Sequence, residues 1–231
     1  MSPLPPTPSR GALEVLPAEE AIRRTVFDGA TLMVGGFGLV GQPLTLVSAL
    51  NASPFANLTI VSNNLGEPGR GLGQTLALGK VRRAVGSFFT SNPEVARHRA
   101  EGRLEVTLIP QGTFAEAIRA GGAGLGGFYT PTGVGTLLAA GKEVREFRGR
   151  LYLLEEPLTA DVALVRAHRA DRLGNLVYYK TARNFNPLMA AAARAVVAEV
   201  DEVVEVGELD PELVATPHLY VDELVLARER L

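Results

Sequence analysis

The stretch that decides the fold of this chain is residues 28–43, D-G-A-T-L-M-V-G-G-F-G-L-V-G-Q-P. Asp28 and Gly29 predict a tight turn, because glycine reaches positive φ without a Cβ clash. Residues 31–34 form a short apolar run that predicts a buried strand. Pro43 suits the first turn of a helix, where a backbone N–H has no partner. The stretch therefore predicts a strand, a glycine-rich loop and a helix in succession.

The loop itself has glycine at positions 35, 36, 38 and 41. Several glycines let bare backbone approach a ligand, and the free N–H groups of a helix start favour negative charge. We therefore expect a binding site here, formed by Gly35, Gly36, Phe37, Gly38 and Gly41. A glycine-rich turn that serves only close packing remains open as the alternative.

Residues 36–41 also fit G-x-G-x-x-G, the fingerprint of dinucleotide-binding proteins. That fingerprint expects an acidic residue about 20 positions further on, which binds the ribose. No Asp or Glu occurs between Asp28 and Glu67, and Gln42-Pro43 is unusual directly after the last glycine. A nucleotide-binding dehydrogenase remains a second hypothesis that lacks its ribose-binding acid.

Composition narrows the function classes. The chain has 231 residues, of which 46% are hydrophobic, and a formal charge of -2. A single α/β domain can reach this length, and the near-neutral charge argues against a nucleic-acid partner. Because the sequence has no cysteine, disulfides, thiolate nucleophiles and thiolate metal sites are excluded. The three histidines, His98, His168 and His218, are widely separated, so we predict structural or surface roles for them and no metal site.

Further features of the sequence bear on domain organisation and cellular location. Residues 1–12 are rich in proline and lack the pattern of a signal or transit peptide, so we expect a flexible tail. Residues 13–231 contain no linker and are predicted to form one domain. No apolar run approaches the roughly 20 residues that cross a bilayer, so no membrane contact is expected. The cytoplasm is the expected location.

The strand, polar loop and helix pattern recurs along the chain. Strand 58–62 leads to Asn63 and Asn64, and strand 104–109 leads to Gln111 at the start of a helix that runs to Arg119. Such repeats predict an α/β fold, an open and mostly parallel sheet with helices on both faces, whose ligands bind at the carboxyl ends of the strands. Asparagines at these ends serve either as turn formers or as donors aimed into a cleft.

The remaining segments give further expectations. Helices are predicted at 17–26, 43–50, 73–79, 93–101 and 186–194, and strands at 81–87, 160–167, 176–179, 196–206 and 219–226. Residues 143–154 predict a hairpin around Arg148-Gly149-Arg150, and residues 171–175 a turn. The glycine-dense segment 121–135 contains aromatic residues, so we expect a lid or wall of the site, or equally a subunit contact.

The string at 28–43 resembles the signature of the α subunit of family I coenzyme A transferases. The resemblance recurs, in the family's order, over nearly the whole chain after Leu13. It is carried by S-N-N-L-G (62–66), P-Q-G-T-F-A-E (110–116), I-R-A-G-G-A-G (118–124), F-Y-T-P-T-G-V-G-T (128–136), A-D-V-A-L-V (160–165) and A-R-N-F-N-P (182–187).

The resemblance implies a ping-pong transfer of CoA through a glutamate nucleophile, which lies in a Ser-Glu-Asn-Gly motif of the β subunit. This sequence contains no such motif. The chain is therefore expected to be half of an enzyme, active only when a β subunit joins it in an α2β2 assembly. Acyl-CoA and 3-oxoacids would be substrates, and no cofactor is expected.

The resemblance also assigns roles to residues. Asn63, Asn64 and Gln111 match family positions that donate amide hydrogens to the reacting carbonyl oxygens, so they are our catalytic candidates. The glycine-loop residues named above would approach the partner's glutamate and the acyl or CoA group, which makes them the substrate-binding candidates.

Acidic residues of this chain are weaker candidates for a nucleophile. Glu155 and Glu156 close the strand 151–154, and a carboxylate at a strand end could attack a thioester. A hydrated or ion-paired surface acid is the better interpretation of both. Glu116 is expected to interact with Arg119 or with the start of its helix.

The substrate is less sharply indicated than the reaction. The chain resembles both the succinyl-CoA:3-oxoacid (acetoacetate) branch and the 3-oxoadipate branch. Gly112-Thr113 and Asn186-Pro187 lean towards the first, and residues 142–146 lean towards the second. Residues 87–99 depart from both. We expect the acetoacetate activity, with the 3-oxoadipate enzyme as alternative and a non-catalytic acyl-CoA or nucleotide-binding module as a further hypothesis.

Overall fold

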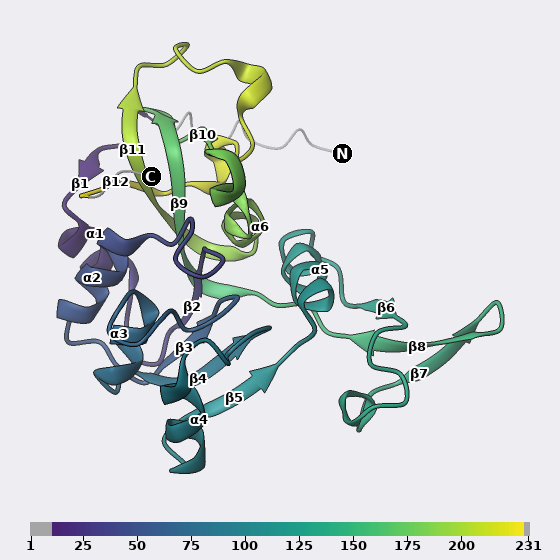
Figure 1. Ribbon diagram of the computed structural model, residues 1–231. Helices are drawn as coiled ribbons and strands as arrows, with labels where there is room; N and C mark the ends of the chain where they lie inside the picture. The colour runs from purple at the N-terminus through teal and green to yellow at the C-terminus, as the bar shows by residue number, and fades with distance from the viewer. Residues whose placement is uncertain (1–10, 229–231) are drawn as a thin grey trace, which may run out of the picture.

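The computed structural model describes residues 11–228, so the predicted tail lies almost wholly outside the described residues. Within them, a nine-stranded sheet has the order β1-β12-β11-β9-β2-β3-β4-β5, with β10 added to β9 (Figure 1). Every ladder is parallel except β10–β9. The strands are β1 Val15–Leu16, β2 Thr31–Val34, β3 Leu58–Val61, β4 Val81–Gly86, β5 Glu105–Leu108, β9 Ala160–Asp171, β10 Leu176–Val177, β11 Ala193–Val204 and β12 Glu223–Leu226. The predicted open, mostly parallel sheet is confirmed.

Helices cover both faces of this sheet, as predicted. Leu32 and Met33, adjacent in β2, belong to two different buried clusters because successive strand residues point to opposite faces. The cluster of Leu32 includes residues of α1 Ala18–Thr25, α2 Leu44–Ala52, α3 Leu72–Ala77 and α4 Pro93–Ala100. The cluster of Met33 includes residues of α5 Gln111–Gly122 and α6 Asn186–Ala191. Strands buried on both faces read as continuous apolar runs, which explains the short uninterrupted strand of residues 31–34.

A second, antiparallel sheet extends away from the main body as an arm (Figure 1). It has the order β6-β8-β7, and its strands are β6 Phe128–Thr130, β7 Val144–Phe147 and β8 Arg150–Glu155. The predicted hairpin is confirmed, with Arg148 and Gly149 at positive φ. The expected loop 121–135 is only partly right, since its first residues end α5 and β6 begins at Phe128. Its role as a lid, wall or subunit contact stays a prediction.

Several predicted boundaries were wrong. The helix predicted at 186–194 ends at Ala191, because Ala193 already belongs to β11 and pairs with Ala160. Strand 176–179 stops at Val177, and strand 219–226 begins only at Glu223, after a short 3-10 helix. Strand 160–167 continues to Asp171. Four 3-10 helices complete the described chain: η1 Leu137–Ala139, η2 Lys180–Arg183, η3 Pro211–Leu213 and η4 His218–Tyr220.

That residues 13–231 form a single domain stays a prediction. Within the part of the chain that the structure describes, no helix is long and apolar enough to cross a membrane.

Candidate active site

The three amide side chains predicted to be catalytic meet at the carboxyl ends of β3 and β5. Asn63 Nδ2 donates to Gln111 Oε1 over 3.3 Å, and Asn64 Nδ2 donates to Asn63 Oδ1 over 3.2 Å. Asn63 and Asn64 are buried, whereas Gln111 is exposed. The structure therefore brings the three residues together as a chain of amides that ends at the surface. We call Asn63, Asn64 and Gln111 the amide cluster.

Ser87 belongs to the same group, although sequence reasoning did not single it out. It follows β4, which lies between β3 and β5 in the sheet. Its Oγ accepts from Asn63 Nδ2 over 2.8 Å, and the backbone N–H groups of Ser87 and Phe88 donate to Asn63 O. Its position directly after a strand between the two amide-bearing strands was the available signal.

Backbone contacts fix the cluster. Ser62 Oγ donates to Val34 O over 2.7 Å, which joins the ends of β2 and β3. Asn64 Oδ1 accepts from Gly66 N over 2.9 Å. Because Gln111 Oε1 accepts from Asn63, its N–H groups are the donors that remain for an oxygen outside the protein. Within residues 11–228, Gln111 Nε2 has no hydrogen-bond partner. Such a preorganised donor can stabilise a developing oxyanion.

The glycine loop after β2 forms a small hairpin. Phe37 N donates to Val40 O over 3.0 Å, and Val40 N donates to Phe37 O over 3.3 Å, so Gly38 and Leu39 form the turn. Phe37 and Val40 are each about half exposed. An equivalent hairpin, closed by Glu67 and Arg70, follows the amide-bearing loop after β3. Two short hairpins thus stand at neighbouring strand ends.

Two asparagines from the A-R-N-F-N-P block hold this glycine loop in place. Asn184 Oδ1 accepts from Gly36 N over 3.1 Å, and its Nδ2 donates to Val40 O over 3.0 Å. Asn186 Nδ2 donates to Gly41 O over 3.0 Å, while its Oδ1 accepts from Arg166 N over 2.8 Å. We call Asn184 and Asn186 the asparagine clamp. Sequence reasoning quoted this block but assigned it no contact with the loop.

The clamp and the backbone beside it explain why two of the loop positions are glycine. A Cβ on Gly35 would lie 1.8 Å from Asn186 Oδ1, and one on Gly41 would lie 2.4 Å from Ala182 O. Both glycines are buried against the chain itself, which supports the packing alternative for them. Phe37 and Gly38 lie at the open tip, where a Cβ on Gly38 would meet no atom within 4 Å. Direct ligand contact by the five loop residues stays a prediction.

The expectation that the start of the following helix offers free N–H groups to a ligand was wrong at Leu46. Leu46 N donates to Glu199 Oε2 over 3.0 Å, and Glu199 is buried on β11. Burial raises the pKa of Glu199, while the Leu46 N–H and Arg166 beside it act in the opposite direction. A carboxylate of the chain itself thus occupies the helix start, the place where a dinucleotide-binding fold would hold pyrophosphate.

Two of the three acidic residues considered above, Glu155 and Glu116, form ion pairs. Glu155 lies 2.7 Å from Lys142 Nζ, and its side chain is 11% exposed. Glu116 pairs with Arg119 at 2.6 Å, as predicted. Among residues 11–228, no three His, Cys, Asp or Glu side chains lie close enough to hold a metal ion.

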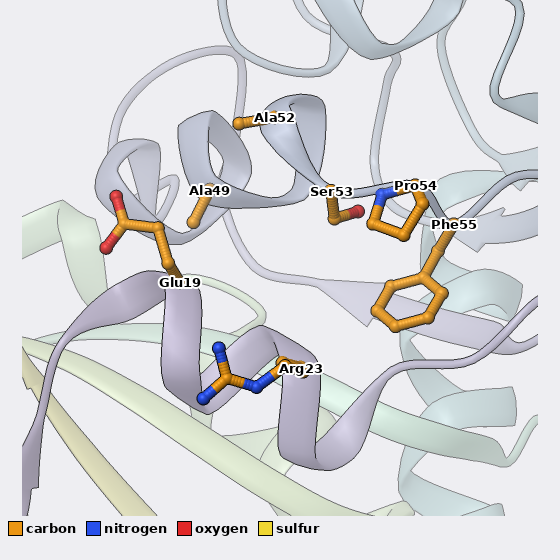
Figure 2. A pocket seen from close by; sticks show the side chains of 7 residues that line it. All are labelled: Glu19, Arg23, Ala49, Ala52, Ser53, Pro54 and Phe55. Carbon is orange, nitrogen blue, oxygen red and sulfur yellow. The ribbon is translucent and has the colours of Figure 1, made fainter.

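A small hollow between α1 and α2 lies elsewhere. Its volume is about 200 Å³, and Figure 2 shows Glu19 and Arg23 of α1 on one side and the end of α2 with residues 53–55 on the other. Phe55 precedes β3, whereas Asn63 follows it, so this hollow lies at the amino ends of the strands and away from the amide cluster.

The sequence matches the family model described as Coenzyme A transferase over residues 15–227. It is 53% identical to a subunit of the succinyl-CoA:3-ketoacid coenzyme A transferase of Xanthomonas campestris pv. campestris (strain B100), covering 94% of this chain and 89% of that protein. It is 51% identical to a subunit of the 3-oxoadipate CoA-transferase of Pseudomonas putida, covering 87% of each. It is also 48% identical to the alpha subunit of the acetate CoA-transferase of Escherichia coli K12, covering 87% and 92% respectively.

Solved structures show the same fold. An acyl-CoA transferase from E. coli O157:H7, in its thioester complex with CoA, matches with a TM-score of 0.84 at 24% identity over 95% of this chain. The chain spans about half of that protein, 48% of its length. Glutaconate coenzyme A-transferase from Acidaminococcus fermentans matches with a TM-score of 0.82 at 18% identity, covering 92% of this chain and 75% of that one. The sequence matches and the fold agree, and this chain belongs to the coenzyme A transferase family.

Proposed function

We propose that this chain is the α subunit of a heteromeric succinyl-CoA:3-oxoacid CoA-transferase. The observation that carries the proposal is the amide cluster at neighbouring strand ends of a coenzyme A transferase fold, with Gln111 at its exposed end. The names of the Xanthomonas campestris and Pseudomonas putida relatives support one subunit of such an enzyme.

The nucleophile would come from a β subunit, since this chain has no Ser-Glu-Asn-Gly sequence. The partner's glutamate carboxylate attacks the thioester carbonyl, the C–S bond breaks, and an acyl-glutamyl anhydride and CoA thiolate form. The thiolate then attacks the glutamyl carbonyl, which releases the donor acid and leaves a glutamyl-CoA thioester. The acceptor carboxylate reverses both steps. Covalent catalysis divides one difficult exchange into easier ones.

Each addition places negative charge on a carbonyl oxygen. Gln111 would donate to that oxygen, Asn63 would hold Gln111 through its carbonyl, and Asn64 would hold Asn63. The donors are fixed before charge develops, which is the condition for electrostatic stabilisation of a transition state. Phe37 and Gly38, at the exposed hairpin tip, would face the partner's glutamate and the acyl group.

The subunit assembly and the cellular location are part of the proposal. We propose an α2β2 enzyme located in the cytoplasm, with acyl-CoA and a 3-oxoacid as substrates and without a cofactor. The relatives from Xanthomonas campestris and Escherichia coli are each named as one subunit of their enzyme. These names support a second kind of subunit in the enzyme formed by this chain.

The test is CoA transfer from succinyl-CoA to acetoacetate, by the chain alone and after co-expression with a Ser-Glu-Asn-Gly-bearing partner. We expect transfer only in the pair. Transfer by the pure chain would reject the proposal. A pair that is inactive with both acetoacetate and 3-oxoadipate as acceptor would also reject it. The second candidate, the 3-oxoadipate enzyme, is favoured by the 51% identity to the Pseudomonas putida protein, and replacing acetoacetate by 3-oxoadipate decides between them.

A further inference from the structure

A groove runs along the outer edge of the main sheet, between α4 and the edge strand β5. Its volume is about 470 Å³, which is within the usual range for small-molecule sites. Its walls are mainly apolar and include Phe88, Phe89, Val95 and Leu108. Ser87, which is hydrogen-bonded to the amide cluster, and Arg99 of α4 also line it. Phe88 and Leu108 remain about half exposed. We call it the edge groove.

The edge groove adjoins the amide cluster. Ser87 lines the groove and also accepts the 2.8 Å hydrogen bond from Asn63 Nδ2. Phe88 N donates to Asn63 O over 3.0 Å, so the loop after β4, which forms part of the groove wall, is hydrogen-bonded to the amide cluster. An acyl group whose carbonyl met the Gln111 donor would have this groove beside it.

Arg99 gives the groove a positive charge. Its neighbours in sequence have acidic partners: Arg97 pairs with Glu94 at 2.9 Å, and Arg103 pairs with Glu101. Within residues 11–228, no carboxylate lies within ion-pair distance of Arg99. The helix rises about 9 Å between Pro93 and Arg99, and both residues line the groove. Arginine is suited to bidentate binding of a carboxylate.

We propose that the edge groove binds the carbon chain of a dicarboxylic acyl group, and that Arg99 binds its distal carboxylate. This inference rests on the proposed function and names its substrate class: acyl groups with a second carboxylate are preferred over monocarboxylic ones. The apolar walls would contact the carbon chain, and the charge of Arg99 would favour substrates with a second carboxylate. Arg99 is thus a specificity-determining residue of this chain.

The test compares succinyl-CoA with acetyl-CoA as donor to acetoacetate, in the assembled enzyme. Arg99→Gln should lower kcat/KM for succinyl-CoA by about 10- to 100-fold, the range for losing one charge-assisted contact, and leave acetyl-CoA nearly unchanged. The control is Arg97→Gln, on the same helix but outside the groove. This variant should change kcat/KM for neither succinyl-CoA nor acetyl-CoA. An unchanged succinyl-to-acetyl ratio in Arg99→Gln, with an active wild-type pair, overturns this inference and leaves the proposed function standing. An inactive wild-type pair fails the proposed function instead.

A second variant separates substrate binding from subunit contact. Ala96 lines the groove from the exposed side of α4, so Ala96→Trp fills the groove without disturbing the core. We expect intact assembly on size-exclusion chromatography and a raised KM for succinyl-CoA. Loss of assembly by Ala96→Trp would show that the partner subunit occupies the groove, and would overturn the inference.

Discussion

The Oδ1 atom of Asn186 lies 1.8 Å from the position that a Cβ on Gly35 would take. Asn186 is itself held by Arg166 N and by Gly41 O, so its amide cannot move aside without losing buried hydrogen bonds. The absence of a side chain at Gly35 is therefore a requirement of the asparagine clamp.

This relationship predicts a non-additive pair of variants. Gly35→Ala should lower both the free energy of unfolding and CoA transfer, because the new Cβ displaces the Asn186 amide. Asn186→Ala alone should cost about 1–3 kcal/mol of unfolding free energy, since buried backbone groups lose partners. Gly35→Ala should lower the free energy of unfolding far less in the Asn186→Ala background than in the wild-type protein. Urea unfolding of all four proteins measures this coupling, and additive costs would contradict the clamp.

Gln111→Ala should lower kcat by about 10²–10³-fold, the loss expected for one oxyanion donor, with little change in the free energy of unfolding because Gln111 is exposed. Gln74→Ala, an exposed glutamine on α3, is the matched control and should keep full turnover. Steady-state kinetics of the assembled pair and urea unfolding give both readouts. Equal kcat in the two variants would remove Gln111 from the mechanism.

Asn64→Ala should reduce both turnover and stability. Gly66 N loses its acceptor and Asn63 Oδ1 its donor, which should cost about 1–3 kcal/mol of unfolding free energy. The combination of a kinetic and a stability loss distinguishes a buried supporting residue from the exposed donor Gln111. A loss of stability with normal kcat would limit Asn64 to turn formation.

Glu199 should make stability depend on pH. Burial raises the pKa of Glu199 above its ordinary value of 4.5. Between the unfolded and the folded pKa, the folded protein therefore binds more protons than the unfolded chain. Its contribution to stability is then greatest below the unfolded pKa and is lost as pH rises through the folded pKa. Glu199→Gln removes this titration and keeps an acceptor for Leu46 N. In urea unfolding series, the variant should therefore gain stability relative to wild type as pH rises from 4.5 towards neutrality. A difference independent of pH would contradict this explanation.

Glu155→Gln should leave CoA transfer within about twofold of wild type, because Glu155 is paired with Lys142 and is not the nucleophile. Its stability cost should stay within about 1 kcal/mol, since Lys142 is partly exposed and solvent screens the pair. Glu156→Gln is the control at the adjacent exposed acid. Abolished transfer in Glu155→Gln alone would restore the hypothesis of a nucleophile within this chain.

Part of the site could be predicted because it follows from local sequence and a general rule of topology. Asn63, Asn64 and Gln111 each follow a recognisable strand, and the carboxyl ends of parallel strands meet at one edge of the sheet. Their proximity is a consequence of strand order alone. The hairpin turn at Arg148 and Gly149 was equally local, since its positive φ values are set by the two turn residues.

Other features depended on packing between distant segments. The alanine-rich residues after Met189 favour a helix, yet Ala193 enters a strand because it pairs with Ala160 of β9. Asn186 contacts Gly41 across 145 residues, and Glu199 contacts Leu46 across 153. No periodicity or motif near any of these residues encodes its partner.

The sequence by itself thus determined the alternation of strands, loops and helices, the parallel sheet and the edge at which the amides gather, because each depends on neighbours in the chain. Only the tertiary structure decided that Glu199 occupies the start of α2, that Asn186 is the reason for Gly35, and that Arg99 lines a groove beside Ser87. Those contacts arise from the burial of polar groups brought together by folding, where each must find a partner to replace the hydrogen bonds it made to water.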